Sequence, residues 1–129
     1  TAILDRETVP WLWESYRRVA PTVAAVLADG SVVNKVGTRT LASAAAAQDV
    51  PVHVAAHADK VAPPGHGVDL EPRDPDELLG ADAPAALGVE QPTFDVTPPG
   101  VVDRYLTERG PLAPEEVDAL AERAAERAD

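Results

Sequence analysis

Cysteine and methionine are absent from this 129-residue chain, and lysine occurs only twice. Without cysteine there is no disulfide, no thiolate metal ligand and no cysteine nucleophile. Aromatic residues are also scarce, at 4% of the sequence. The core must therefore consist mainly of alanine and valine, whose side chains bury little area. We expect such a domain to gain stability from self-association or from a partner subunit.

The balance of charge is strongly acidic, with 22 acidic and 11 basic residues and a net charge of −11. This acidic charge excludes a general nucleic-acid-binding protein and a protein that binds anionic membrane surfaces, because both would carry basic patches. No apolar run approaches the roughly 20 residues of a membrane span. Charged residues within the first ten argue against a signal peptide. We expect a cytoplasmic protein, with an acidic surface typical of proteins that work at high salt.

The chain divides by pattern into two parts. Residues 1–22 hold a candidate helix over 6–18, followed by a divergent segment, and residues 23–129 have the pattern of one α/β domain. In that domain, an apolar strand over 23–27 leads through Asp-Gly into a helix. Asn34 is a good cap for this helix, which runs to about residue 47.

A second apolar strand follows over residues 50–56. Such a strand is typical of a parallel sheet buried on both faces. Together these elements predict a βαβ unit, with parallel strands.

The second half of the domain begins with a long segment, residues 62–92, that is rich in proline, glycine and acidic residues. It predicts a loop with at most a short helix near 76–79. An extended piece over 92–97 precedes a helix over 98–108, which Gly110 ends. The last predicted element is a helix over residues 114–128.

The candidate chemistry lies where the first strand gives way to the first helix. Asn34 and Lys35 stand just before Gly37-Thr38, at the predicted start of that helix. Free N–H groups at a helix start and an ammonium group together attract phosphate. Lys60 follows the second strand, and parallel strands would bring both lysines to one sheet edge. The alternative is a capped helix with two solvated lysines.

Metal and cofactor chemistry have little support in the sequence. The three histidines lack the spacing of a zinc site, and no glycine-rich nucleotide loop or serine-nucleophile motif occurs. We therefore expect no metal and no cofactor, and a phosphorylated small molecule is the predicted ligand.

Four stretches in order carry a family resemblance. They are residues 26–38 (VLADGSVVNKVGT), 50–56 (VPVHVAA) with Lys60, 92–99 (PTFDVTPP) and 107–110 (TERG). Their sequence resembles the initiation factor two-B alpha, beta and delta subunit family. That family includes ribose-1,5-bisphosphate isomerase and methylthioribose-1-phosphate isomerase.

The resemblance covers residues 23–112 and matches the C-terminal portion of the family fold. It implies an α/β domain of Rossmann-like, three-layer form with a mainly parallel sheet, partial relative to the family. It also implies that Asn34, Lys35 and Lys60 contact a sugar phosphate. Phe94, Asp95 and Thr97 lie in a segment similar to the family's site-closing and dimer-contact element.

One departure from the family concerns catalysis directly. The family's isomerases use an aspartate as the proton shuttle, and the matching position here is Ala24. Their catalytic cysteine is also absent. A methyl group takes no proton, and loss of a general base typically costs about 10²–10⁴-fold in rate. The first hypothesis is therefore a non-catalytic binding and interaction domain, like the regulatory subunits. The second is a subunit or fragment of a sugar-phosphate isomerase.

Overall fold

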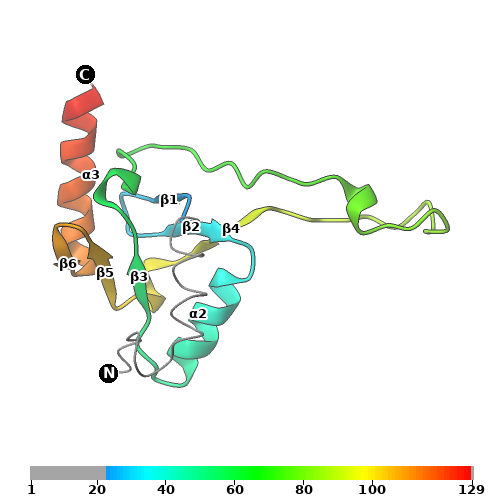
Figure 1. Ribbon diagram of the computed structural model, residues 1–129, viewed down its shortest axis with the longest axis horizontal. Helices are drawn as coiled ribbons and strands as arrows, with labels where there is room; N and C mark the ends of the chain where they lie inside the picture. The colour runs from blue at the N-terminus through cyan, green and yellow to red at the C-terminus, as the bar shows by residue number, and fades with distance from the viewer. Residues whose placement is uncertain (1–22, 129) are drawn as a thin grey trace.

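A computed structural model describes residues 23–128, which form two small β-sheets and two α-helices (Figure 1). The first sheet has the order β1-β2-β4 and the second β3-β5-β6. The strands are β1 (Ala25–Val26), β2 (Val32–Lys35), β3 (His53–Ala55), β4 (Phe94–Thr97), β5 (Arg104–Thr107) and β6 (Gly110–Leu112). The helices are α2 (Thr38–Ala47) and α3 (Pro114–Ala128), with 3₁₀ turns η2 (Ala58–Lys60), η3 (Pro75–Glu77) and η4 (Pro99–Val101). The expected α/β class is therefore found, whereas the expected helix over 6–18 lies outside the described residues.

A hairpin opens the described chain. β1 and β2 pair antiparallel, and Leu27 and Ser31 close the turn between them through the Leu27 N–H and the Ser31 carbonyl at 2.8 Å. Asp29 accepts hydrogen bonds from both the N–H and the hydroxyl of Ser31. The predicted helix start at Asn34 was wrong, because Asn34 belongs to strand β2 and the helix begins at Thr38. Asp29-Gly30 between two apolar stretches is a hairpin signal.

The expectation of a mainly parallel sheet with a βαβ unit was also wrong. Three of the four strand pairs within residues 23–128 are antiparallel, and only β3 and β5 run parallel. The first and second predicted strands lie in different sheets. The reason is that both edges of β1 are taken: β2 pairs on one side, and Val61 bridges Val26 on the other.

The helix predicted over residues 98–108 is replaced by η4 and strand β5. β5 turns back through residues 108 and 109 into β6, at a glycine with a φ of 108°. Tyr105 and Thr107 have side chains that favour strands, although the spacing of the apolar residues in this stretch also fits a helix. Pairing with β3 on one side and β6 on the other decides between the two.

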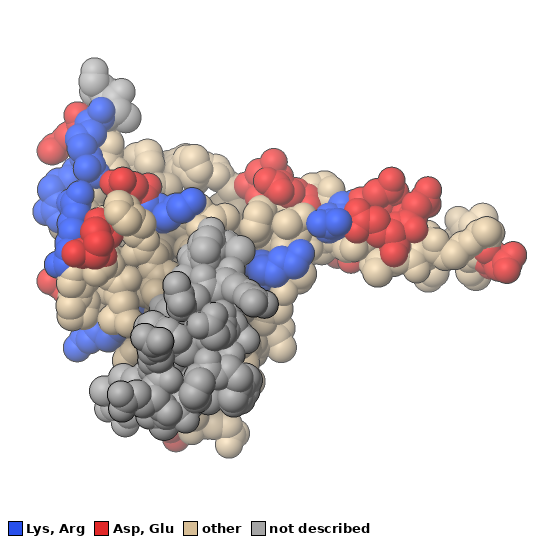
Figure 2. Space-filling model, in the orientation of Figure 1, with Lys and Arg blue, Asp and Glu red and all other residues tan. Residues whose placement is uncertain are grey.

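The segment over residues 62–92 projects from the body as an extended arm (Figure 1). Its two legs are joined near the base, where the Arg73 N–H donates to the Gln91 carbonyl at 2.8 Å and Pro72 bridges Pro92. The short helix expected near 76–79 is the single turn η3. Acidic side chains gather along the arm (Figure 2), so it presents negative charge well away from the sheets.

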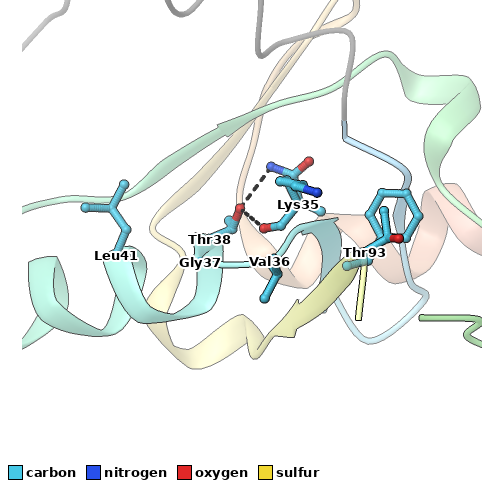
Figure 3. Close-up of a pocket in the computed structure, with 8 residues that line it drawn as sticks. Lys35, Val36, Gly37, Thr38, Leu41 and Thr93 are labelled. Carbon is cyan, nitrogen blue, oxygen red and sulfur yellow. Dashed lines mark hydrogen bonds between the residues drawn. The ribbon is translucent and has the colours of Figure 1, made fainter. Parts of the chain in front are cut away.

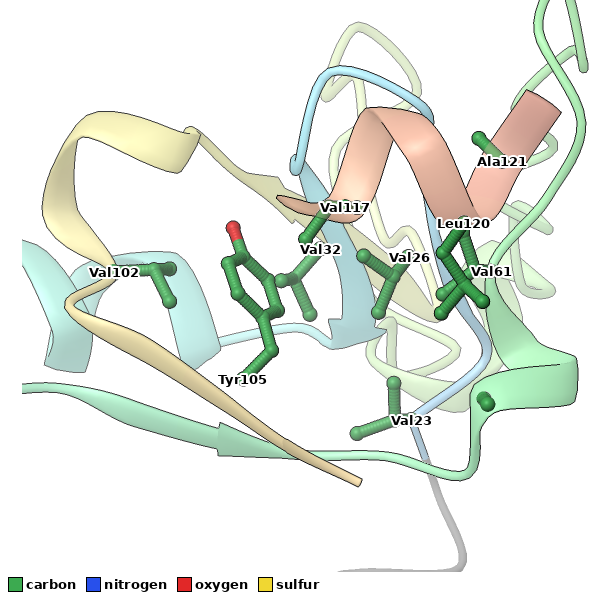
Figure 4. Close-up of a cluster of buried hydrophobic side chains, with 10 residues drawn as sticks. Val23, Val26, Val32, Val61, Val102, Tyr105, Val117, Leu120 and Ala121 are labelled. Carbon is green, nitrogen blue, oxygen red and sulfur yellow. The ribbon is translucent and has the colours of Figure 1, made fainter. Parts of the chain in front are cut away.

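The core lies between the two sheets and α3 (Figure 4). It consists mainly of small side chains, as the composition predicts: Val23, Val26, Val32, Ala58, Val61, Val102, Tyr105, Val117, Leu120 and Ala121. One face of α3 contributes Val117, Leu120 and Ala121 to this core. Neither α2 nor α3 has the length and apolar character needed to cross a membrane.

The largest fully buried side chain in the described part of the chain is Tyr105. Its hydroxyl donates a hydrogen bond to the carbonyl of Gly30, in the turn between β1 and β2. Burial and, second, the charge of Asp29 raise the pKa of Tyr105 to about 12. This contact ties the second sheet to the hairpin of the first.

Replacement of Gly30 by alanine tests that close approach. Gly30 has a φ of 86°, and a Cβ there would lie 2.8 Å from the Tyr105 hydroxyl oxygen. We expect Gly30→Ala to lower the free energy of unfolding by roughly 2–5 kcal/mol, because backbone strain and overpacking add. Gly110→Ala is the matched control, with a φ of 108° but nothing within 4 Å of its Cβ. Urea unfolding measures both, and equal losses would contradict the close approach.

The raised pKa of Tyr105 predicts a loss of stability at alkaline pH. The folded state holds this proton more tightly than the unfolded state, whose tyrosine titrates near 10. Its contribution is therefore complete below pH 10 and declines as the pH rises towards 12. The ultraviolet absorbance of phenolate should show a late-titrating tyrosine that is missing in Tyr105→Phe. A difference spectrum centred on an ordinary tyrosine pKa would refute this.

Candidate functional site

Asn34 and Lys35 form the end of β2, directly before α2. The Asn34 side-chain amide donates to the Thr38 hydroxyl at 3.2 Å, and that hydroxyl donates to the Lys35 carbonyl at 2.7 Å (Figure 3). Asn34 is only 7% exposed, and its buried Oδ1 atom has no hydrogen-bond partner among residues 23–128. These bonds fix the turn from strand to helix, with the Lys35 residue exposed at the surface.

Asp95 supplies the cap of α2. Its carboxylate accepts the Gly37 N–H at 2.8 Å and the Arg39 N–H at 3.2 Å to each oxygen. The Gly37 amide, which we expected to be free for a phosphate, is thus already bonded to a carboxylate. Asp95 lies opposite Asn34 in the β2–β4 pairing. It was predicted as part of a closing or dimer segment, and its capping role went unseen because 58 residues separate it from Gly37.

An open pocket of about 560 Å³ lies beside this turn. Its lining residues are Asn34, Lys35, Val36, Gly37, Thr38, Leu41, Thr93 and Phe94. Lys35 is the one charged residue among them, and it faces Phe94 across the β2–β4 pair. The pocket therefore offers a single ammonium group within a mainly apolar wall, as a site for a small anion with an apolar body would.

Lys60 sits apart from that pocket lining, at the end of η2. The sheet edge that we expected it to share with Lys35 does not exist, because β2 and β3 are in different sheets. The residue after Lys60, Val61, runs beside β1, and β1 separates it from β2. Two strand spacings therefore separate the backbone of Val61 from that of β2 by roughly 10 Å.

Glu108 holds η2 in place, and this residue had no predicted role. Its carboxylate accepts the Ala58 N–H at 2.8 Å, and its other oxygen lies 3.8 Å from His57 Nε2. The hydrogen bond from the Ala58 backbone, more than the nearby His57 and Arg109, lowers the pKa of Glu108. The position of Lys60 therefore depends on a residue 50 positions away from Ala58.

The remaining site positions divide between surface and interior. Phe94 lines the pocket, whereas Thr97 is 1% exposed and lies opposite Val32 inside the sheet. Ala24 is exposed, and its N–H donates to the Val33 carbonyl at 3.0 Å. Continuing the β1–β2 register by one residue sets Ala24 beside Asn34. Among residues 23–128, no three histidine, aspartate or glutamate side chains gather as a metal site would require.

Residues 23–114 match the initiation factor 2 subunit family. A ribose 1,5-bisphosphate isomerase from Haloferax volcanii is 48% identical over an alignment of 102 residues that covers 74% of this chain and 32% of that protein. The 5-methylthioribose 1-phosphate isomerase structure from Pyrococcus horikoshii superposes with a TM-score of 0.61 at 26% identity, over 81% of this chain and 30% of that one. The delta subunit of translation initiation factor eIF-2B from A. fulgidus gives a TM-score of 0.64 at 29% identity, over 81% and 32%. The chain spans about a third of the length of these proteins.

Removal of the Asp95 cap is expected to weaken the start of α2. Asp95→Ala loses the acceptor of two amides and should lower the free energy of unfolding by about 1–2 kcal/mol, whereas Asp95→Asn keeps a capping oxygen and should lose well under 1 kcal/mol. Urea unfolding followed by circular dichroism measures both variants. A loss in Asp95→Asn as large as that in Asp95→Ala would refute the cap.

Proposed function

Because this chain belongs to the initiation factor 2 subunit family, we propose that it is the phosphate-binding part of a sugar-phosphate isomerase of the ribose 1,5-bisphosphate type. The observation that carries the proposal is the pocket beside Lys35, within residues 23–114 that match the family. The chain spans about a third of that enzyme, so the activity belongs to the longer protein.

The residues around the pocket suit a phosphorylated sugar. The Lys35 ammonium would hold a phosphate through charge-assisted hydrogen bonds, while Phe94 and Val36 would pack against the carbon skeleton. Lys60, fixed through η2 and Glu108, is proposed as a second phosphate contact. A bisphosphate, with one phosphate at each end of a pentose, is the class of ligand that two separated lysines would suit. In this proposal, β3, β5 and α2 belong to a Rossmann-like domain that is complete only in the longer protein.

Isomerisation needs a proton acceptor, and the residues that line the described pocket include no carboxylate that could serve as one. An aldose–ketose interconversion moves a proton between neighbouring carbons, and the position that the resemblance gives to the proton shuttle is Ala24. Ala24 lies beside Asn34, so the gap falls next to the proposed ligand. We therefore propose that the chain alone binds the ligand and does not isomerise it.

A second candidate is a non-catalytic subunit of the translation initiation type. Ala24 favours it, because a regulatory subunit needs no proton acceptor, and the A. fulgidus eIF-2B delta subunit shares the fold. Such a subunit would act through assembly. Leu41, which is 73% exposed, and Val36, which is 47% exposed, suit contact with a second copy or with another subunit. Both candidates place the protein in the cytoplasm.

Calorimetry with ribose 1,5-bisphosphate tests the binding part of the proposal. Lys35→Ala should weaken binding by about ten-fold or more, because a charge-assisted hydrogen bond contributes roughly 1.5–3 kcal/mol. Arg73→Ala, which removes a cation paired with Glu77 on the arm, is the control and should leave binding unchanged. Equal affinities of wild type and Lys35→Ala would rule out the site.

Phosphorus NMR on the same mixture tests the absence of catalysis. We expect the bisphosphate signals to persist without ketose product. Turnover that survives purification and disappears in Lys35→Ala would show that the chain supplies its own proton acceptor, against the role given to Ala24.

A further inference from the structure

The start of α2 is occupied by the protein's own anion. Asp95 accepts the Gly37 N–H at 2.8 Å and the Arg39 N–H at 3.2 Å, and Gly37 also lines the pocket beside Lys35. A helix start attracts negative charge through these first amides and through its dipole. A carboxylate bonded to them uses the same hydrogen bonds and cancels part of the same positive field.

We propose that Asp95 opposes anion binding in the pocket, so that within the pocket lining only the Lys35 ammonium attracts the phosphate. The inference rests on the proposed function, because it concerns the same pocket. In this role Asp95 limits how strongly a dianion is held, and it does so without contacting a reacting group.

Geometry supports a direct electrostatic effect. Asp95 pairs with Asn34 across β2 and β4, and its neighbour Phe94 pairs with Lys35. The carboxylate itself lies 2.8 Å from the N–H of Gly37, a residue of the pocket lining. A phosphate held in the pocket would therefore lie close enough to Asp95 for repulsion between the two anions, whereas more distant surface charges are screened.

Capping and repulsion are separable by an isosteric change. Asparagine at position 95 keeps an oxygen that can accept the α2 amides, so the helix start stays in place. It removes the negative charge, and with it the repulsion. If Asp95 served only to hold the helix, loss of its charge would leave phosphate binding unchanged or weaken it. The proposal predicts the opposite sign.

The test is calorimetric titration of ribose 1,5-bisphosphate into the whole 129-residue chain, as wild type and as Asp95→Asn, at low ionic strength. We expect Asp95→Asn to bind about three- to ten-fold more tightly, a range set by Coulomb repulsion at an intermediate dielectric. Added sodium chloride should shrink the difference, because salt screens the repulsion but does not alter the cap. Circular dichroism confirms that α2 is retained.

Asp103→Asn is the matched control. Asp103 is an exposed carboxylate that also accepts a backbone N–H, from Val52 at 2.7 Å, and it does not line the pocket. Its neutralisation changes the net charge equally and should leave affinity within about two-fold of wild type, since distant exposed charges are screened.

The outcomes separate this inference from the proposed function. If wild type binds the bisphosphate and folded Asp95→Asn binds it equally tightly or more weakly, the role of Asp95 is refuted, but the pocket is still supported as the binding site. Tighter binding that persists undiminished at high salt, or that Asp103→Asn reproduces, would also refute it. Absence of binding in wild type and in Asp95→Asn alike would refute both.

Discussion

The hydrogen bond from the Tyr105 hydroxyl to the Gly30 carbonyl connects the two sheets of this fold. A core of valine and alanine has few large side chains, and the buried Tyr105 must satisfy its hydroxyl inside the protein. The turn between β1 and β2 provides the acceptor, and only glycine leaves room for the approach. This contact helps to position the hairpin, while pairing with β4 holds Asn34 and Lys35 at the end of β2.

The sequence was most informative where a local signal sufficed. The Asn34-Lys35 pair does lie at a strand-to-helix turn beside a pocket, and α2 and α3 end near their predicted limits. Predictions failed where a distant partner decided the outcome. β5 has a helical pattern of apolar residues, yet pairing with β3 makes it a strand. The cap of α2 comes from Asp95 in β4, which no spacing within 34–47 reveals.

Two opposing charges define what the candidate site can do. Lys35 gives the pocket its single ammonium, and Asp95 occupies the amides that would have added to its attraction. Beside them lies Ala24, at the position to which the sequence resemblance assigns the proton shuttle of the isomerases. The family membership and this arrangement together favour a phosphate-binding part without its own proton shuttle.

Amide chemical-shift mapping during titration with ribose 1,5-bisphosphate tests the central claim most directly, because it reports where a ligand binds. We predict that the largest chemical-shift changes centre on the end of β2 and the start of α2, from Asn34 to Thr38, with a second group of changes around Lys60. Changes centred on the arm over residues 62–92 or on α3, with Asn34 to Thr38 unaffected, would contradict it.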